Sequence, residues 1–222
     1  MKRNIIYFVV LILLTACNTN PTPELISKDD EVLTPAATPS AEQTFPIAQE
    51  IVSPCGLDPI VLPAMPAIIP QSTELDPDTG LHMTGKVQLV DINTYRLKIS
   101  GLVNNPLELS FEDLRCMPKI TVTALLICPF VFEDESTWSG VPITHLFKLA
   151  EIKEGASKVT FISVDGYRAS ISLEEALLQD NFVAYEMLGQ PLPILHGFPV
   201  RAVLPSITGG KWIKWLGEIV VQ

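Results

Sequence analysis

The amino-acid sequence predicts an α+β fold with mixed β-sheets and short helices, and three observations predict it. Short apolar runs of strand character recur between residues 95 and 221, and one pair is joined by a two-residue hairpin signal. The helical segments between these runs are short and begin with capping residues. No glycine-rich turn joins a strand to a helix, which argues against a doubly wound fold.

The expected elements follow in chain order. Tyr95–Ser100 alternates apolar and polar side chains, as a half-buried strand does, and Ser110 with Asp113 is an N-cap signal for a helix that ends at Arg115. We expect Ile120–Cys128 to be a mostly buried strand, followed by a loop that reaches Trp138. The further expected elements are a helix Ile143–Ala150, strands Val159–Val164 and Tyr167–Ile171 around the hairpin signal Asp165-Gly166, a helix from the Ser172–Glu175 capping box to Gln179, and strands Val183–Met187, Val200–Leu204 and Gly217–Val221.

The N-terminal residues predict export and a lipid anchor. Lys2 and Arg3 precede the apolar run Ile5–Leu14, which is too short to span a bilayer. The run continues into Leu14-Thr-Ala-Cys17, which resembles the lipobox of bacterial lipoproteins and implies cleavage after residue 16 and acylation of Cys17. The alternatives are an ordinary signal peptide and an uncleaved anchor. We therefore expect a signal-bearing lipoprotein, anchored in the cell membrane and facing the extracytoplasmic side, periplasmic or extracellular.

Composition divides the chain into four parts. Residues 1–16 form the signal peptide, and residues 17–49, rich in proline, threonine, serine and alanine, form a disordered tether. Residues 50–84 form an extended, proline-rich lead segment, and residues 85–222 form the folded domain. The formal net charge of −10 becomes −12 when the two basic residues of the signal peptide are removed (−10 − 2). Such an acidic protein is not expected to bind nucleic acid.

The number of cysteines limits which disulfides the exported protein can form. With Cys17 acylated, Cys55, Cys116 and Cys128 remain, and an odd number leaves at least one thiol unpaired in an exported protein. A Cys55–Cys116 disulfide with Cys128 free is one consistent arrangement, and three buried thiols is another. Cys128, at the end of an apolar run, is either a small core residue or a ligand.

The most unusual local composition lies between residues 187 and 217, where an acidic chain has no Asp or Glu. The same stretch contains His196, Arg201, Lys211 and Lys214, together with Gly209-Gly210, whose backbone N–H groups can face an anion without obstruction by a Cβ. Arginine offers a planar fork to phosphate, and lysine adds point charge. This pattern favours a pocket for a phosphate-bearing ligand, and the alternative is a solvated turn with scattered cations.

The other histidines and the acidic residues after Cys128 are not assigned to a functional site. His82 and His145 have no supporting cluster, and Asp134 and Glu135 are interpreted as solvated loop carboxylates. No two histidines lie at the spacing of metal ligands, so no zinc site is expected.

Six motifs follow one another in residues 85–222. They are Gly101-Leu-Val-x-x-Pro-Leu-x-Leu-Ser110, the strand that ends at Cys128, Trp138-x-Gly-Val-Pro142, Val164-Asp-Gly-Tyr167, Ala184-Tyr185 with Gly189-x-Pro-Leu192, and His196-Gly-x-Pro-x-Arg201 with Gly210-Lys-Trp-x-Lys-Trp215. In this order they resemble the molybdopterin-binding domain of the sulfite oxidase family. The resemblance is stronger to the compact bacterial branch that includes the periplasmic methionine sulfoxide reductase catalytic subunit.

The resemblance implies an oxidoreductase with a molybdenum ion held by the dithiolene of one molybdopterin and by the thiolate of Cys128, its catalytic residue. Such a cofactor carries out two-electron oxygen-atom transfer on a small oxo-substrate, while the protein orients it. No haem-attachment motif is present, so electrons are expected to pass through an unidentified electron-transfer protein, and we expect a monomer. By the same resemblance, the cofactor-binding residues are Ser163, His196, Arg201, Lys211, Trp212, Ile213 and Lys214.

Two departures from the family pattern support an alternative, a cofactor-free lipoprotein that uses the same fold as a binding or scaffolding module. Proteins with this cofactor are usually exported through the twin-arginine route, and Met1-Lys-Arg-Asn4 has no twin arginine. Many relatives also carry Asn and Arg after the ligand cysteine, whereas Pro129–Glu135 is apolar and then acidic. Like charge there would repel sulfite, so sulfite oxidation is not expected.

Overall fold

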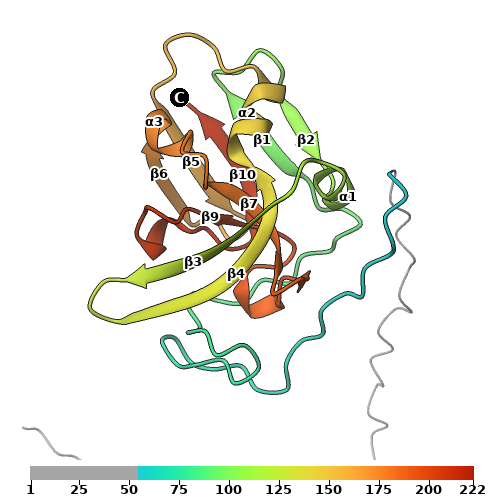
Figure 1. Ribbon diagram of the computed structural model, residues 1–222, viewed down its shortest axis with the longest axis vertical. Helices are drawn as coiled ribbons and strands as arrows, with labels where there is room; N and C mark the ends of the chain where they lie inside the picture. Colours follow the sequence, from blue (N-terminus) through green and yellow to red (C-terminus); the bar gives the residue numbers. More distant parts are fainter. Residues whose placement is uncertain (1–54) are drawn as a thin grey trace, which may run out of the picture. The chain divides into compact units, whose positions relative to one another are not determined.

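Two five-stranded β-sheets make up the centre of the molecule (Figure 1). The computed structural model describes residues 55–222, so the signal peptide, the acylation site Cys17 and the tether lie outside the described residues. One sheet has the strand order β2-β1-β10-β5-β6, and the other has the order β3-β4-β7-β8 with β9 also paired to β7. Both parallel and antiparallel pairs occur, and the helices are short, which confirms the prediction of a mixed α+β fold.

The first sheet contains the single parallel pair, β1 with β10. Gly101 ends β1 with φ +91°, and a Cβ built there would lie 2.0 Å from the carbonyl oxygen of Val221. Only glycine fits, because the backbone conformation and the approach of β10 both exclude a side chain. The strands of this sheet are β1 (Leu97–Gly101), β2 (Leu107–Leu109), β5 (Lys158–Ser163), β6 (Arg168–Ser172) and β10 (Leu216–Val221).

The second sheet is built around a long hairpin. Its strands are β3 (Ile120–Cys128), β4 (Phe132–Pro142), β7 (Phe182–Met187), β8 (Gln190–Pro191) and β9 (Arg201–Val203). The β4–β7 register shifts between Ser139 and Gly140, and a Cβ on Gly140 would lie 2.0 Å from the carbonyl oxygen of Val183. The glycine of the Trp138–Pro142 motif is therefore needed for the close approach of two backbones.

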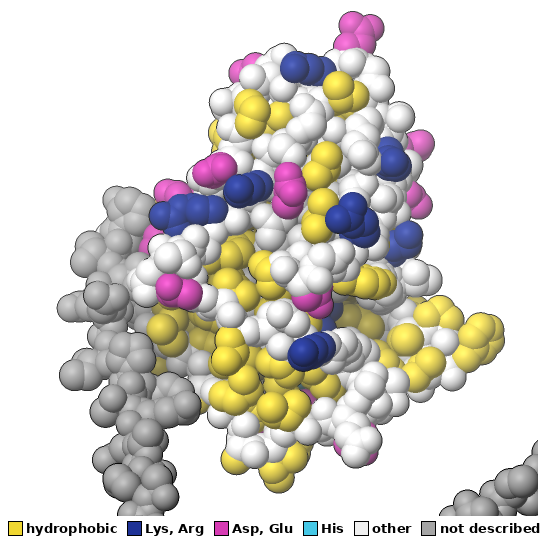
Figure 2. All heavy atoms as spheres, turned by 180° about the vertical axis from the view of Figure 1, so that it is seen from behind, with side chains coloured by type: hydrophobic (Ala, Val, Ile, Leu, Met, Phe, Trp, Pro, Cys, Tyr) yellow, Lys and Arg dark blue, Asp and Glu magenta, His cyan; other side chains and the backbone are white. Residues whose placement is uncertain are grey.

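The expected strand Ile120–Cys128 has the predicted bounds, but the predictions that it is mostly buried and that a loop follows it are wrong. Its side chains alternate between exposed and partly buried, because the β3–β4 hairpin extends from the domain with one face toward solvent (Figure 1). The segment after Cys128 turns within three residues and returns as β4. Phe130 and Val131 at this turn are exposed, and Figure 2 shows hydrophobic side chains at the end of the hairpin, at its lower right.

The helices are short and begin where the sequence predicts. Ser110 and Ser172 both cap with a complete capping box, in which the serine accepts from an N–H three residues on and the acidic side chain accepts from the serine N–H. α3 ends three residues before the expected Gln179, where Leu177 leaves the helical conformation. No helix among residues 55–222 is long and apolar enough to cross a membrane. The helices are α1 (Phe111–Arg115), α2 (Ile143–Ala150), α3 (Leu173–Ala176) and the 3-10 turns η1 (Ile194–His196) and η2 (Gly209–Lys211).

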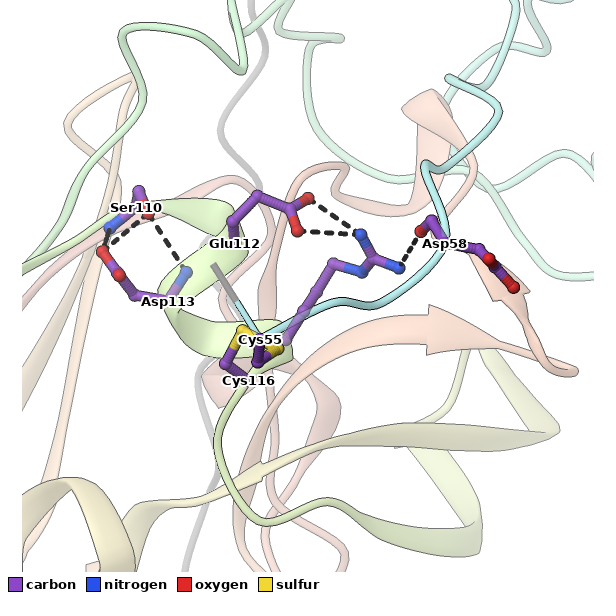
Figure 3. Close-up of a disulfide and its surroundings, with 7 residues drawn as sticks. Cys55, Asp58, Ser110, Glu112, Asp113 and Cys116 are labelled. Carbon is purple, nitrogen blue, oxygen red and sulfur yellow. Dashed lines mark hydrogen bonds and ion pairs between the residues drawn. A yellow bond between two sulfur atoms is a disulfide. The ribbon is translucent and has the colours of Figure 1, made fainter. Parts of the chain in front are cut away.

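A disulfide ties the lead segment to the domain. Cys55 and Cys116 are bonded, and Cys128 is a free thiol, so the first of the two cysteine arrangements is the one observed (Figure 3). Arg115, the last residue of α1, donates to both carboxylate oxygens of Glu112 and to the carbonyl oxygen of Asp58. The bond closes a loop of 61 residues that includes all of the lead segment after Cys55, so the start of this segment is held against α1.

Candidate cofactor site

A cavity of about 310 Å³ lies between three parts of the chain. They are the β3–β4 hairpin, residues 75–85, and the last third of the chain. Residues 75–85, which are the end of the lead segment and the first residue of the domain, are called the strap. Twenty residues line it: Leu81, His82, Thr84, Gly85, Leu126, Cys128, Phe132, Asp134, Trp138, Ser163, Asp165, Tyr167, His196, Arg201, Gly209, Gly210, Trp212, Ile213, Lys214 and Trp215.

The hairpin supplies one wall because alternate residues of a strand share a face. The register pairs Cys128 with Phe132 and Leu126 with Asp134, and Trp138 lies further along the same face of β4. The Cys128 thiol is thus neither in a disulfide nor sealed in the core; it is partly buried and lies at the cavity. This position is the one that a metal ligand requires.

The paired glycines bring the backbone of η2 against this wall. A Cβ on Gly209 would lie 2.6 Å from Leu126 Cδ2 and 3.0 Å from the carbonyl oxygen of Ile127. A side chain at Gly209 would therefore collide with the hairpin. Gly210 has open space around its Cα, and its carbonyl oxygen accepts from the Tyr167 hydroxyl at 3.0 Å.

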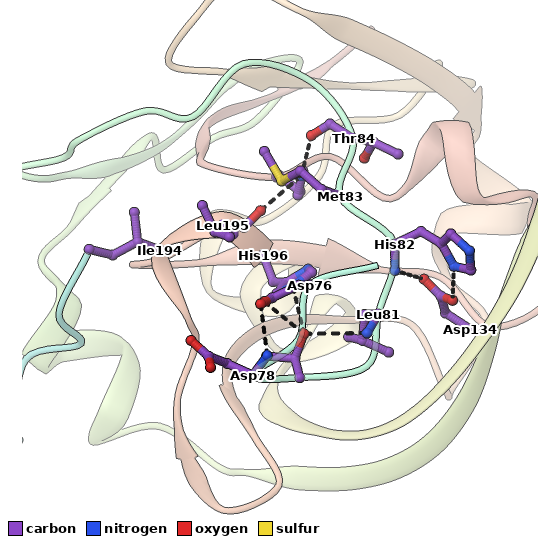
Figure 4. A network of polar contacts seen from close by, with 12 residues as sticks. Asp76, Asp78, Leu81, His82, Met83, Thr84, Asp134, Ile194, Leu195 and His196 are labelled. Carbon is purple, nitrogen blue, oxygen red and sulfur yellow. Dashed lines mark hydrogen bonds and ion pairs between the residues drawn. The ribbon is translucent and has the colours of Figure 1, made fainter. Parts of the chain in front are cut away.

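His196 is buried and held by the strap (Figure 4). Its Nε2 lies 2.9 Å from both Asp76 Oδ2 and Thr79 Oγ1. Burial, together with the positive charges of Arg201 and Lys214, lowers the pKa of His196 to about 4 against the opposing effect of Asp76. The neutral ring donates from Nε2 to the carboxylate, which leaves Nδ1 as a hydrogen-bond acceptor.

Asp76 remains ionised so that it can accept this bond. Burial raises the pKa of Asp76, but hydrogen bonds from Thr79, the N–H of Asp78 and His196 outweigh it and place the pKa below its usual value. The strap thereby fixes the tautomer and orientation of His196, as a carboxylate does for a histidine in many active sites.

Arg201 lines the cavity between two tryptophans. Its guanidinium carbon is 4.7 Å from the centre of the Trp138 ring and 5.9 Å from that of Trp212. It donates to the carbonyl oxygens of His196 at 3.2 Å and Trp212 at 3.3 Å. Burial lowers the pKa of Arg201 to about 9, partly offset by Asp134. A charge so strongly desolvated is stabilised when an anion binds beside it.

Lys214 has similar surroundings. Its ammonium donates to the carbonyl oxygens of Thr84 and Leu195, and it lies 4.6 Å from the centre of the Trp215 ring. Burial, followed by repulsion from Arg201, lowers the pKa of Lys214 to about 7. Two cations with lowered pKa at one cavity are typical of a site built for an anionic group.

The cavity also contains polar atoms without partners. Among residues 55–222, four buried side-chain polar atoms lack a hydrogen bond, and three of them belong to residues that line this cavity. Those three are Trp138 Nε1, Ser163 Oγ and Arg201 Nε. Native proteins rarely leave such groups unsatisfied, so these atoms indicate a polar ligand in the cavity. A heterocycle rich in nitrogen and oxygen with an attached phosphate fits this set of donors.

The structure brings together seven of the eight residues predicted to form the site. Cys128, Ser163, His196, Arg201, Trp212, Ile213 and Lys214 all line the cavity. Lys211 does not, because its ammonium donates to the carbonyl oxygen of Ser170 on β6 at 2.9 Å.

The sequence pattern does not indicate that the strap and its partner on the hairpin belong to the site. His82, interpreted as having no supporting cluster, bonds Asp134 through Nδ1 at 2.7 Å and through its backbone N–H at 2.8 Å (Figure 4). Asp134, interpreted as a solvated loop carboxylate, is a buried residue of β4. Both interpretations are wrong. No local pattern in the sequence indicates this pairing, because the two residues lie 52 positions apart. The turn-forming Asp76-Pro-Asp-Thr-Gly80 was the local signal that the lead segment adopts a defined structure here.

Comparison with known proteins identifies the domain. Residues 84–222 match the family model described as "Oxidoreductase molybdopterin binding domain". The chain belongs to this family of molybdopterin-binding oxidoreductases. Its cofactor is therefore molybdenum with molybdopterin, which agrees with the donors that line the cavity.

Individual members of the molybdopterin-binding family support the assignment. The chain is 32% identical over 140 residues to the uncharacterized oxidoreductase YuiH of Bacillus subtilis, covering 63% of this chain and 71% of that protein. It is 33% identical over 174 residues to the sulfite oxidase of Arabidopsis thaliana, covering 62% of this chain but only 44% of that enzyme. The chain thus spans less than half the length of that enzyme.

The same fold occurs in a solved structure, the sulfane dehydrogenase SoxCD from Paracoccus pantotrophus. The match has a TM-score of 0.61 and 24% identity, and it covers 66% of this chain and 43% of that chain. At this identity the likeness concerns the fold, and it confirms the α+β architecture of the molybdopterin-binding domain.

The buried His196 predicts how the stability of the cofactor-free protein depends on pH. Its pKa is about 4 in the folded state and 6.5 in the unfolded chain, so between these values only the unfolded state binds the proton. The free energy of unfolding should therefore fall by about 3 kcal/mol as the pH falls from 6.5 to 4. In His196→Gln, which retains a donor to Asp76, this pH dependence should be much weaker.

Urea unfolding of the cofactor-free protein at several pH values measures this effect. His145→Gln, which changes a histidine on α2 away from the cavity, is the matched control and should follow the wild type. Equal pH dependence in all three proteins would show that His196 is not buried in the neutral form.

Proposed function

We propose that this protein is a membrane-anchored molybdenum oxidoreductase that carries out two-electron oxygen-atom transfer on a small oxo-substrate. The observation that carries the proposal is the free thiol of Cys128 at a cavity that also contains unsatisfied polar atoms and two buried cations. A thiolate is a soft ligand that suits a redox-active metal, and coordination keeps it deprotonated. We therefore assign Cys128 as the protein ligand of molybdenum.

The other residues of the cavity would bind and orient the cofactor. When bound, molybdopterin with its metal supplies the two-electron redox chemistry. His196 offers the acceptor Nδ1, while Ser163 and Trp138 offer unpaired donors for the polar edges of the ring system. Arg201 and Lys214 supply positive charge for the phosphate, in a site where burial strengthens the attraction.

The location and partners are part of the same proposal. Acylation at Cys17, followed by the tether, would hold the domain at the extracytoplasmic face of the membrane. The chain has no haem-attachment motif, so we propose that a separate electron-transfer protein exchanges electrons with the site of a monomeric enzyme.

The test is metal and pterin analysis of the full-length protein purified from its native membrane. We expect about one molybdenum and one molybdopterin per chain, with three sulfur ligands at the metal by X-ray absorption, two from the dithiolene and one from Cys128. A pure, folded preparation without molybdenum and pterin would refute the enzyme and support the cofactor-free binding module. Molybdenum with only two sulfur ligands would refute the assignment of Cys128.

A further inference from the structure

The β3–β4 hairpin projects from the domain (Figure 1) and has a second face, turned away from the cavity. Successive residues of a strand point to opposite sides of the sheet. Cys128 and its cross-strand partner Phe132 line the cavity, so their neighbours along the chain point the other way. We call this side, together with the exposed turn, the outer face; it consists of Leu125, Ile127, Phe130, Val131, Glu133 and Glu135.

The apolar side chains of the outer face are exposed to solvent. Phe130 and Val131 have relative exposures of 109% and 56%, and Leu125 and Ile127 each have 39%. Single exposed apolar residues are ordinary on a protein surface, whereas several on one projecting hairpin form a patch of the kind that binding partners cover.

Phe130 occupies a turn position that favours glycine. The N–H of Val131 donates to the carbonyl oxygen of Cys128 at 3.0 Å, which closes a four-residue turn with Pro129 and Phe130 at its centre. Phe130 has φ +65°, a left-handed conformation that glycine adopts more readily than an aromatic residue. Its exposed ring adds nothing to the core that would compensate for the strain. An aromatic side chain held in this way is typical of an anchor for a binding partner.

The two carboxylates of the outer face have no cation beside them. Among residues 55–222, neither the Glu133 nor the Glu135 side chain makes an ion pair or a hydrogen bond, whereas Glu108 on β2 pairs with Lys98. Residues 120–147 contain no Lys or Arg. Two like charges on one side of a strand repel each other, so a partner that brings cations to this face would stabilise them.

The outer face lies directly behind the free thiol. Ile127 and Cys128 are consecutive residues on opposite sides of β3. Packed sheet layers lie about 10 Å apart, so a protein seated on the outer face comes close to Cys128 without entering the cavity. A substrate in the cavity and a partner on the outer face can therefore bind at the same time.

We propose that the outer face is the docking surface for the electron-transfer protein, and that this partner presents an apolar patch ringed by lysine or arginine. The inference rests on the proposed function, to which it adds the contact surface and the chemistry of the partner. Each docked carrier takes one electron, so the enzyme loses two electrons as two oxidised carriers are reduced.

The probe is pseudoazurin, a small copper protein whose apolar patch is ringed by lysines, and its matched control is the same protein with acetylated lysines, which lack the charge. Calorimetry measures its binding to the full-length protein in detergent, at low and at physiological ionic strength. One hairpin variant combines Glu133→Gln with Glu135→Gln, and the other is Phe130→Gly. The matched control combines Glu151→Gln with Glu154→Gln, two exposed residues after α2, which begins at the other end of β4.

We expect the paired Glu133 and Glu135 variant to weaken binding about tenfold at low ionic strength and to lose most of the salt dependence. Phe130→Gly should weaken binding about tenfold at both ionic strengths, because salt does not screen an apolar contact. This variant should fold normally, since glycine suits the turn. The paired Glu151 and Glu154 variant should bind like the wild type, and acetylated pseudoazurin should bind weakly to every protein.

Four binding results would overturn the inference. Equal weakening by the two paired variants would show a general attraction to an acidic protein, and unchanged affinity in Phe130→Gly would show that the turn is not contacted. A dimer that Phe130→Gly dissociates in sedimentation would show that a second copy covers the outer face. Loss of pseudoazurin binding on reconstitution into phosphatidylcholine vesicles would show that a bilayer covers it.

Electron transfer provides a second readout. Reduced holoenzyme should bleach the blue absorbance of two pseudoazurin molecules, and both hairpin variants should slow this second-order reaction about tenfold. Oxidation by benzoquinone, a small neutral acceptor that needs no docking surface, should be equal in all proteins. If both acceptors react more slowly, the hairpin residues affect the site itself and the inference fails. A preparation without molybdenum would refute the proposed function, whereas the binding measurement would still decide whether a cationic protein docks here.

Discussion

Replacing Cys128 by serine is expected to abolish turnover while leaving the fold intact. The thiol lies at the end of β3, partly buried and free of any disulfide, and serine fits the same space. A hydroxyl is a poor ligand for a metal that prefers soft sulfur donors. We expect kcat to fall by at least about a thousandfold, or roughly 4 kcal/mol of transition-state stabilisation. The free energy of unfolding should change by less than about 1 kcal/mol.

The adjacent residue provides the matched control for Cys128→Ser. Ile127 precedes Cys128 on β3, and alternation along the strand points its side chain to the opposite, exposed face of the hairpin. Ile127→Ser should retain activity. Assays with a reduced dye, together with molybdenum and pterin analysis of each variant, measure the outcome. Wild-type turnover in Cys128→Ser with full cofactor content would show that the thiol is not a metal ligand.

The sequence predicts those parts of the fold that depend on local chemistry. The capping boxes at Ser110 and Ser172 and the hairpin around Asp165-Gly166 each require only a few neighbouring residues, and the structure has all three. The hairpin turn is longer than the two residues predicted, because the last paired residues are Ile162 and Arg168. The acid-free stretch likewise points to His196 and Arg201, because the absence of carboxylates over a long interval can be seen without knowing the fold.

The parts that the sequence does not predict depend on contacts between distant residues. The first half of β4, from Phe132 to Ser136, is acidic and lacks a strand signal, and its pairing with β3 determines its conformation. The strap bonds His196 from 120 residues away, so no local pattern indicates that Asp76 belongs to the site. Lys211 was predicted to bind the cofactor, but its ammonium donates to Ser170 instead. Neighbouring residues of a short motif need not face the same cavity.

Replacing Arg201 by methionine is expected to have opposite effects on the cofactor-free and the cofactor-loaded protein. Without a cofactor, the guanidinium is buried beneath Trp138 with its Nε unsatisfied, and its pKa is lowered to about 9. Exchanging a buried, poorly compensated charge for an apolar side chain of similar length often stabilises a protein by about 1–4 kcal/mol. The loss of two hydrogen bonds to backbone carbonyl oxygens offsets part of this gain, so we expect about 1–2 kcal/mol.

The loaded protein should respond in the reverse direction. The same guanidinium is one of the two cavity cations that we propose bind the phosphate of molybdopterin, so Arg201→Met should retain less than about a tenth of the wild-type cofactor, a loss of at least 1.4 kcal/mol in binding. Because a bound ligand stabilises the folded state by mass action, the stabilisation that cofactor loading gives the wild type should also disappear.

Urea unfolding of both forms and pterin analysis measure the two effects, with Arg168→Met, a change at an exposed residue of β6, as the matched control. If the Arg201 charge only stabilises the fold, its removal should make the cofactor-free protein less stable. If the charge is placed for a ligand, its removal should make the cofactor-free protein more stable, because without cofactor nothing compensates the desolvation free energy of the buried guanidinium. The sign of the change in the cofactor-free protein therefore distinguishes a structural arginine from a binding one, independently of any assay of activity.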